Sequence, residues 1–258
     1  MTCLQVTGLP AFDDNYIWML TQEDGQGAVV VDPGDDEPVQ QWLQNQGKHL
    51  QAILITHKHG DHTGGVTGLK QQWPDAQVYG PAHEPVQADV KLADGDRLEL
   101  LGVVFDVLEV PGHTEGHLAY WGDGKLFCGD TLFAAGCGRV FSGSFEQLAD
   151  SLQRIAHLPK HTALYCAHEY TLANLGFARW VEPENAALLE RIAQEEAKRQ
   201  AGQPTLPSSL ELELATNPFL RTGEPAVIGA AEKWAGRPLN GHRAVFKALR
   251  QWKDRDYD

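Results

Sequence analysis

Hydrophobic and polar residues alternate in short runs along the first two thirds of the chain, which predicts strands separated by helices. Residues 50–56 form a β-branched apolar run of the length of a buried strand. Amphipathic spacing predicts helices at residues 37–46 and 64–73, and Ser144 with Gln147 has the spacing of a capping box that opens a helix ending near residue 157. Further strands are predicted at residues 15–20, 27–32, 97–101, 103–110, 118–121, 125–128 and 163–167.

The pattern changes near residue 168, after which strand signals disappear. Helices are predicted at residues 172–181, 184–201, 208–215 and 243–253. Ser208 and Glu211 form a second capping-box candidate, just after a proline. We therefore predict an α/β domain in residues 1–168 and a helical domain in residues 169–258.

Composition and charge narrow the class of protein. A chain of 258 residues can bury a substantial core, and its formal net charge of −14 disfavours nucleic acid and anionic membranes as partners. No apolar run approaches the ~18 to 20 residues that cross a bilayer, and the first residues lack an export signal. Cys3, Cys128, Cys137 and Cys166 have no CxxC spacing, so we expect reduced thiols in a cytoplasmic protein.

Four metal-binding side chains fall within six residues directly after a predicted strand: His57, His59, Asp61 and His62. His57 and His59 are two residues apart, so in an extended segment both rings project to the same side. Gly60 is expected to let the chain turn, so that Asp61 and His62 approach a second point nearby. Imidazole with carboxylate suits zinc, iron or manganese, and the absence of a thiolate argues against a closed structural zinc site.

Further ligands are expected where other predicted strands end. His113, Asp130 and His168 each follow such a strand, and taken singly each is an ordinary turn residue. Their shared position at strand ends would let one rim of a sheet collect all three. His117 and Asp32 are interpreted as groups that orient ligands. The remaining histidines have no partner pattern and are expected in surface or core roles: His49, His83, His157, His161 and His242.

Three of these segments resemble the motifs of the metallo-β-lactamase superfamily: Thr-His-x-His-x-Asp-His at residues 56–62, Pro-Gly-His-Thr-x-Gly-His at 111–117 and Phe-Cys-Gly-Asp-Thr at 127–131. More narrowly, the chain is similar to the glyoxalase II (hydroxyacylglutathione hydrolase) family over nearly its whole length. That similarity rests on residues 12–16, 129–133, 136–138, 166–170, 174–178 and 217–219. It implies an α/β fold, an αββα sandwich with a C-terminal helical domain.

The resemblance also implies roles for individual residues. It gives His57, His59 and His113 to one ion, Asp61, His62 and His168 to the other, and makes Asp130 the bridge. It implies glutathione contacts from Arg139, Tyr170, Arg250 and Lys253. Phe141 is a departure, because some relatives have tyrosine there, and it is left out of the expected site.

The expected chemistry is hydrolysis of S-D-lactoylglutathione to D-lactate and glutathione. Two divalent ions bring four positive charges, and Asp61, Asp130 and a bridging hydroxide remove three of them. The remaining charge favours an oxyanion as the hydroxide attacks the thioester carbonyl. A thiol, with a pKa near ~8.5, can leave as thiolate without a proton donor.

Zinc is the first expectation for the metal, with iron and manganese as alternatives. We expect a monomer acting on a small molecule, without nucleic-acid or membrane partners.

Other readings remain open at this point. The same metal scaffold serves lactonases, β-lactamases and nucleases, and an inactive binding module or an iron-pair redox sensor is a further alternative. Arg250 and Lys253 lie three apart on one face of a predicted helix, where basic residues are often merely solvated. Cys137 has no adjacent base in the sequence and is expected to be inert.

Overall fold

The computed structural model describes residues 4–257, which fall into two compact units. Unit 1 contains the described residues up to Glu109 together with Thr114–Gly129. Unit 2 contains Val110–His113 and the described residues from Asp130 onward. The two units are groups of residues that contact one another more than they contact the rest of the chain. The chain passes between the units more than once. The predicted domain boundary near residue 168 divides the chain by position in the sequence and not by contacts. It stays a prediction.

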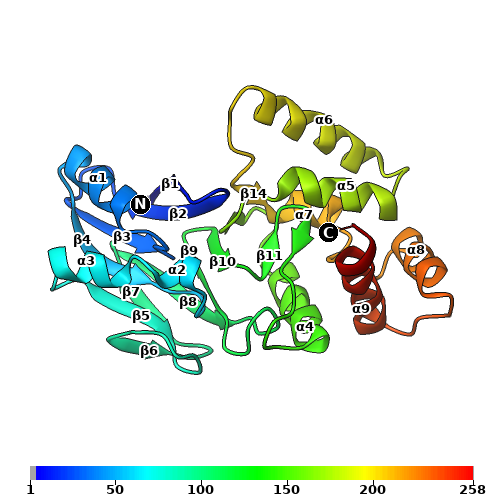
Figure 1. The fold of residues 1–258 in the computed structure, drawn as a ribbon, viewed down its shortest axis with the longest axis horizontal. Helices are drawn as coiled ribbons and strands as arrows, with labels where there is room; N and C mark the ends of the chain where they lie inside the picture. The colour runs from blue at the N-terminus through cyan, green and yellow to red at the C-terminus, as the bar shows by residue number, and fades with distance from the viewer. Residues whose placement is uncertain (1–3, 258) are drawn as a thin grey trace. The chain divides into compact units, whose positions relative to one another are not determined.

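The first sheet of unit 1 has six strands in the order in which they occur along the chain (Figure 1). β1 to β3 pair antiparallel, and β3 to β6 pair parallel. The strands are β1 (Gln5–Ala11), β2 (Asn15–Thr21), β3 (Gly27–Val31), β4 (His49–Leu54), β5 (Gln77–Pro81) and β6 (Val90–Leu92). Three helices connect them: α1 (Glu37–Gln46), α2 (Gly60–Thr63) and α3 (Val66–Gln72).

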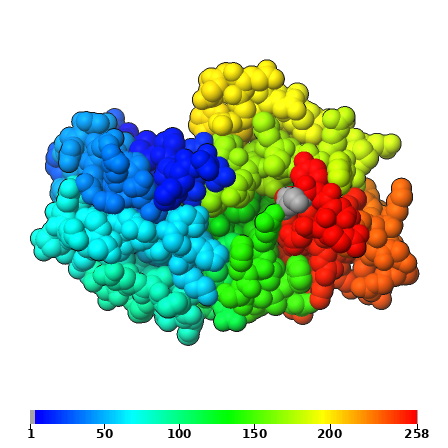
Figure 2. Space-filling model, in the orientation of Figure 1, coloured from blue at the N-terminus to red at the C-terminus, as the bar shows by residue number. Residues whose placement is uncertain are grey.

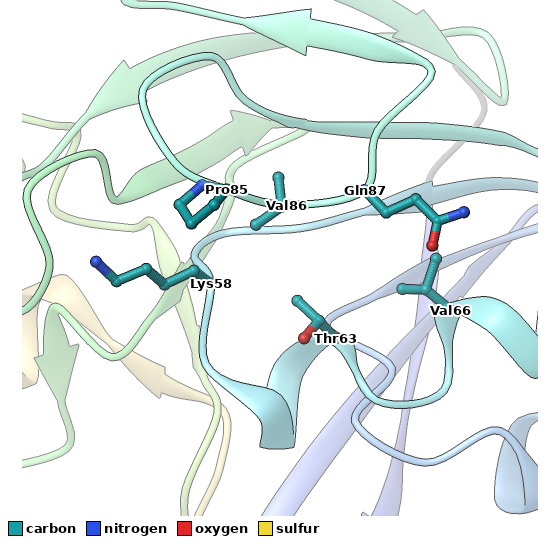
Figure 3. Close-up of a pocket in the computed structure, with 6 residues that line it drawn as sticks. All are labelled: Lys58, Thr63, Val66, Pro85, Val86 and Gln87. Atoms are coloured by element: carbon teal, nitrogen blue, oxygen red, sulfur yellow. The ribbon is translucent and has the colours of Figure 1, made fainter.

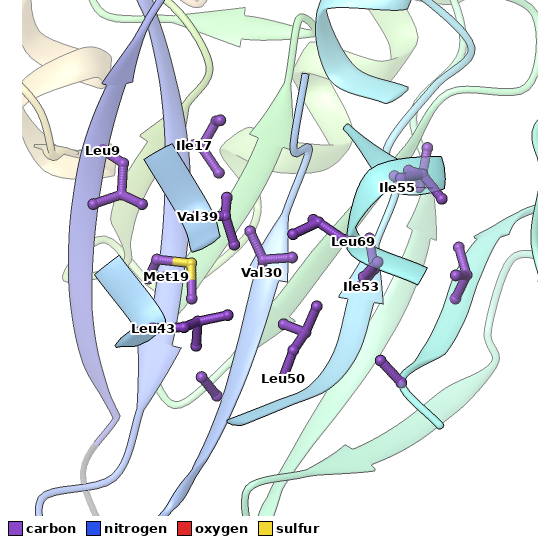
Figure 4. Packing of buried hydrophobic residues seen from close by; sticks show 14 of the residues in the cluster. Leu9, Ile17, Met19, Val30, Val39, Leu43, Leu50, Ile53, Ile55 and Leu69 are labelled. Atoms are coloured by element: carbon purple, nitrogen blue, oxygen red, sulfur yellow. The ribbon is translucent and has the colours of Figure 1, made fainter. Parts of the chain in front are cut away.

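A hydrophobic core lies between this sheet and helices α1 and α3. Figure 4 shows Val39 and Leu43 of α1 packed with Val30 of β3 and Ile53 of β4. Every residue of β3 is buried, and its side chains alternate between two faces, so both faces of the sheet are covered. β4 pairs with β3 and ends at Leu54, and the histidine motif begins just after it.

The second sheet contributes four antiparallel strands to unit 1, in the order β10, β9, β8, β7. They are β7 (Arg97–Leu100), β8 (Val103–Glu109), β9 (Leu118–Gly122) and β10 (Lys125–Gly129). Tyr120 on β9 donates a 2.6 Å hydrogen bond to the carbonyl of Ile55, just beyond β4. The amide of Leu118 donates to the carbonyl of Thr56 at 2.8 Å. These bonds place the start of β9 beside the histidine motif.

Unit 2 is mainly helical, with two small strand pairs. β11 (Leu132–Phe133) pairs with β12 (Gly136–Cys137), and β13 (Ala163–Cys166) pairs with β14 (Ser208–Ser209). The helices are α4 (Phe145–Ala156), α5 (Thr171–Val181), α6 (Ala186–Gln200), α7 (Leu210–Thr216), α8 (Pro225–Ala235), α9 (His242–Trp252) and the π-helix η1 (Lys253–Tyr257). Figure 2 shows α6, in yellow, and α8, in orange, on the visible surface. No helix of residues 4–257 is long and apolar enough to cross a membrane.

Most predicted elements are confirmed, and helix α1 matches its predicted range. The predicted cap at Ser144 is confirmed, because its hydroxyl accepts a hydrogen bond from the amide of Gln147 at 3.1 Å. The second capping prediction is wrong: Ser209 caps α7, whereas Ser208 lies in β14 and donates its hydroxyl hydrogen to Glu213. The same strand shows that strand structure continues after residue 168. Strands β1, β5, β6, β11, β12 and β14 and helices α2 and α8 were not predicted.

Candidate metal centre

The first two histidines of the motif lie in extended chain directly after β4. His57 is fully buried, and its Nε2 lies 2.9 Å from Nδ1 of His59. The ring centroids are 4.6 Å apart, with the rings nearly perpendicular. The prediction that both rings project to the same side is confirmed, and their nitrogens converge on one point.

His62 follows on the short helix α2 and is also fully buried. Its Nδ1 lies 2.9 Å from Oδ2 of Asp32, and its Nε2 lies 3.4 Å from Oδ2 of Asp61. The reason given for Gly60 is wrong: the chain turns as a right-handed helix, and a Cβ there would meet nothing within 4 Å. Glycine is required instead at Gly34, because a Cβ at that position would overlap the carbonyl of Asp61.

Asp32 fixes this arrangement from the end of β3. One carboxylate oxygen accepts the amide hydrogen of Thr56 at 2.8 Å. The other accepts the Thr56 hydroxyl at 2.7 Å and faces His62. Ligand atoms of Asp32, His57 and His62 all lie within 4.8 Å of one another. His117 stacks on His57, with ring centroids 4.6 Å apart. These contacts suit the predicted orienting role of both residues. We call His57, His59, Asp61 and His62 the histidine cluster.

Unit 2 holds the other three predicted ligands around one carboxylate. Asp130 Oδ2 lies 3.4 Å from Nε2 of His113, and its Oδ1 lies 3.4 Å from Nε2 of His168. The other ring nitrogen of His113 lies 2.8 Å from the carbonyl of Arg139, which fixes the orientation of that ring. A Cβ at Gly138 would overlap the carbonyl of Asp130, so a larger residue would disturb it. We call His113, Asp130 and His168 the Asp130 cluster.

The hairpin of β11 and β12, which follows Asp130, is held by a buried polar network that the sequence did not reveal. Glu213 accepts the amide hydrogen of Ala135 at 2.8 Å and pairs with Arg191 at 2.6 Å. Asn217 donates to the carbonyls of Phe133 and Gly136 at 3.2 and 2.9 Å. Because Glu213 and Arg191 are almost fully buried, each depends on the other for its stability in the core.

The four residues expected to contact glutathione all lie in unit 2. Arg250 is 1% exposed, and its guanidinium donates to the carbonyl of Cys137 at 3.0 Å and pairs with Asp254 at 2.8 Å. Arg139 is half exposed, and its Nε lies 3.7 Å from the same carboxylate. Lys253 is 5% exposed and begins the π-helix after α9. The alternative that Arg250 and Lys253 are solvated surface residues is therefore wrong. Asp254 was missed, although its i,i+4 spacing from Arg250 was a usable signal.

Aromatic rings lie beside the Asp130 cluster. Tyr170 stacks on His168, with ring centroids 4.7 Å apart and an angle of 7°. Phe141 is exposed and directs its ring toward the edge of His113, 5.1 Å away. Tyr170 is the one of these two whose hydroxyl can donate a hydrogen bond to a bound molecule.

The donor set fits divalent metal ions. Each unit presents imidazole nitrogens and carboxylate oxygens, most of them buried, and these are borderline ligands suited to zinc, iron or manganese. Two of the cysteines are not suited to the role: burial raises the pKa of the Cys137 thiol to about 11 and that of Cys166 to about 12, so both stay protonated. This supports the expectation that Cys137 is inert. Cys3 lies outside the described residues.

Two sequence families together match residues 12–256 of the chain. Residues 12–168 match the metallo-beta-lactamase superfamily, and residues 169–256 match the hydroxyacylglutathione hydrolase C-terminus. The hydroxyacylglutathione hydrolase of Xanthomonas euvesicatoria pv. vesicatoria (strain 85-10) is 54% identical over 252 residues, 97% of this chain and 98% of that protein. The chain belongs to the hydroxyacylglutathione hydrolase family. The hydroxyacylglutathione hydrolase of Pseudomonas fluorescens (strain SBW25) is 52% identical over 98% of this chain and 99% of its own length.

A solved structure supports the same fold. TTHA1623, crystallised in a di-iron-bound form, is 26% identical, with a TM-score of 0.58 over 84% of this chain and all of that one. The predicted αββα metallo-β-lactamase fold with a C-terminal helical region is thus confirmed, as is the prediction of a hydrolase. Membership of the hydroxyacylglutathione hydrolase family also sets aside the inactive-module and redox-sensor readings.

Proposed function

We propose that the chain hydrolyses the thioester bond of S-(2-hydroxyacyl)glutathione, with S-D-lactoylglutathione as substrate and D-lactate and glutathione as products. Water supplies the oxygen of the new carboxylate, and the sulfur of glutathione leaves and takes up a proton. One observation carries the proposal: complete His/Asp clusters occur in a chain whose match to the hydroxyacylglutathione hydrolase family extends through residues 169–256.

The two clusters are proposed to hold two divalent ions together. His57, His59 and His113 would bind one ion, Asp61, His62 and His168 the other, and Asp130 would bridge them. Covalent connection supports this assignment, because Asp130 is the next residue after Gly129 at the end of β10. β10 pairs with β9, whose first residue bonds to Thr56, and neighbouring Cα atoms are only about 3.8 Å apart. Zinc is our first choice, with iron and manganese as alternatives.

Bound divalent ions would lower the pKa of water to about 7 and so supply hydroxide at neutral pH. The chain's own residues prepare the site for this. Asp32 accepts from Thr56 and faces His62, which fixes the imidazole that binds metal. His57, His62, His113 and His168 are buried, and the low dielectric around buried groups would strengthen charge interactions with the developing oxyanion. The thiolate leaving group needs no proton donor, and none of the residues above is assigned that role.

Unit 2 is proposed to bind the glutathione part of the substrate. Arg250 and Lys253 would bind the carboxylate of its glycine, with Arg139 and Tyr170 as further contacts. Asp254 already pairs with Arg250, so a substrate carboxylate would share or replace that partner. The guanidinium is held in place by the Cys137 carbonyl, and such preorganisation lowers the entropy cost of binding.

The direct test is hydrolysis of S-D-lactoylglutathione by the purified protein, followed as loss of thioester absorbance. We expect turnover that a chelator abolishes and that added zinc restores. An oxygen ester lactone and a β-lactam serve as comparison substrates on the same scaffold. Hydrolysis of either of these in preference to the glutathione thioester would contradict the proposal.

A cytoplasmic location, a monomeric state and the absence of nucleic-acid and membrane partners also remain predictions. The formal charge of −14 supports the last of these, since it repels phosphate backbones. No disulfide joins Cys128, Cys137 and Cys166 in the part of the chain that the structure describes, which suits a reducing compartment. We likewise keep the domain boundary at residues 168 and 169 as a proposal.

A further inference from the structure

Glu84 is a buried carboxylate that belongs to none of the recognised motifs. It lies in the segment after β5 and is 5% exposed. One of its oxygens accepts the amide hydrogen of Lys58 at 2.6 Å. The other accepts the amide hydrogen of Gly116 at 3.1 Å. Hydrogen bonds to a carboxylate are about twice as strong as those between neutral groups.

Both donors lie inside segments that carry metal-site histidines. Lys58 stands between His57 and His59, so the bond to its amide fixes the peptide that joins His57 to Lys58. Gly116 precedes His117, whose ring stacks on His57. One carboxylate therefore connects two segments that are distant in sequence. Both bonded amides are next to histidine residues of the site in the chain.

We propose that Glu84 is a positioning residue that sets the orientation of His57, His59 and His117 for metal binding. The proposal rests on the metal ligands proposed above. Rotation of the peptide before Lys58 would change the direction of both flanking imidazoles, whose nitrogens now converge at 2.9 Å. Glu84 would affect metal binding only indirectly, through the orientation of these histidines, and would not be a ligand itself.

The segment that follows Glu84 lies partly against a cavity and partly in the hydrophobic core. The residues that follow it, Pro85, Val86 and Gln87, line a cavity of about 150 Å³ together with Lys58, Thr63 and Val66 (Figure 3). Val86 is nevertheless buried and belongs to the same hydrophobic core as Val66 of α3, so packing also holds this segment. The hydrogen bonds of Glu84 add a direct connection from this segment to the backbone beside His57, His59 and His117.

The chemistry of the carboxylate suggests a nearly isosteric test. Two oxygens accept from two amides, whereas the glutamine in Glu84→Gln has one oxygen acceptor and one NH₂ donor. That variant can satisfy only one of the two amides and turns a donor toward the other. Asp89→Asn is a control for the loss of a nearby carboxylate, because Asp89, just before β6, accepts the amide hydrogen of Val78 at 3.0 Å and pairs with Lys70 at 3.0 Å, and neither partner lies in the histidine motif.

The experiment measures zinc dissociation constants by chelator competition for the parent, Glu84→Gln, Glu84→Ala and Asp89→Asn. Circular dichroism of each apoprotein checks that it is folded. We expect Glu84→Gln and Glu84→Ala to bind zinc about 10- to 100-fold more weakly and Asp89→Asn to stay within about twofold of the parent. Saturating zinc should restore most of the activity of Glu84→Gln.

Three outcomes would overturn the proposal. A dissociation constant of Glu84→Gln within twofold of the parent, with or without a lower melting temperature, would make Glu84 purely structural. Equal weakening in Asp89→Asn would show a general loss of stability. If Glu84→Gln binds zinc weakly and saturating zinc does not restore its activity, its main defect is not in metal binding. Absence of zinc binding in the parent itself would instead contradict the proposed metal centre, so the two failures are distinguishable.

Discussion

The histidine cluster of unit 1 and the Asp130 cluster of unit 2 are assembled in opposite ways. The first comes from six consecutive residues and is oriented from outside by two buried carboxylates, Asp32 and Glu84. The second comes from three segments spread between residues 113 and 168, and both of its histidines face one carboxylate, Asp130.

The difference predicts how each cluster fails. In the histidine cluster the restraints are shared, so the loss of one leaves others in place. In the Asp130 cluster a single side chain lies against both imidazoles. Unit 2 should therefore be the more sensitive to a single substitution, and unit 1 should lose metal affinity in steps.

The strongest test of this contrast is Asp130→Asn. The amide keeps the shape of the side chain but removes the negative charge that would hold both ions. Since loss of an orienting group already costs about 10- to 100-fold, we expect kcat to fall by more than about 10²-fold and zinc affinity to fall as well. Steady-state kinetics with zinc added to saturation measures this. Near-normal turnover of the metal-replete variant would show that Asp130 is not the bridge.

The next largest effect is expected for the double variant Arg250→Ala, Lys253→Ala. These residues would bind a part of the substrate that does not react, so their loss should raise KM and leave kcat nearly unchanged. Charged hydrogen bonds contribute roughly 1.5 to 3 kcal/mol each, which predicts a loss of ~10²-fold or more in kcat/KM.

A matched substrate separates binding from folding in this variant, because Arg250 also bonds to Cys137. The defect should disappear for the glycine-amide analogue of the thioester, which lacks the carboxylate. Equal impairment on both substrates, or on neither, would make the pair structural.

A smaller effect is expected for Asp32→Asn in unit 1. The amide of Thr56 can keep one acceptor, but the second oxygen, which faces His62, is lost or replaced by a donor. Zinc affinity should fall by about 10- to 100-fold, with activity restored at high zinc. Isothermal titration with zinc gives the value. A defect as severe as that of Asp130→Asn would remove the contrast between the two clusters.

The sequence predicted the two clusters to different degrees, for a physical reason. His57 and His59 could be placed on one side of the chain because strand geometry alternates side chains, and this is local. His113, Asp130 and His168 were suggested by their positions at strand ends, but their assignment to ions came from family resemblance. Long-range pairing depends on packing, which no local pattern records.

The same limit explains the residues that were missed. Glu84 and Glu213 lie in no motif, and each accepts backbone amide hydrogens from distant residues, whose identity leaves no signal in the sequence. The cap of α7 was displaced by one residue because Ser208 bonds to Glu213, and only Ser209 remains to cap the helix. Tertiary contacts therefore decide which of two neighbouring serines caps a helix.

The smallest predicted effect concerns Cys137, which bonds to Arg250 in unit 2. Burial raises the pKa of its thiol from 9.0 to about 11, so the folded protein holds this proton more tightly than the unfolded chain. Its contribution to stability is complete below pH 9 and is lost as the pH rises through 11. Cys137→Ala should therefore show a shallower decline in melting temperature between pH 9 and 11. An unchanged decline would assign it to other groups, such as Cys166.

Metal content tests the central claim most directly, since both clusters are required to bind two ions. Seven ligands with one shared carboxylate overfill a single tetrahedral ion, so we expect close to two equivalents of metal per chain at saturation. Elemental analysis of the purified, metal-replete protein, with activity measured on the same sample, gives the number. One equivalent at saturation together with full activity would contradict the dinuclear centre.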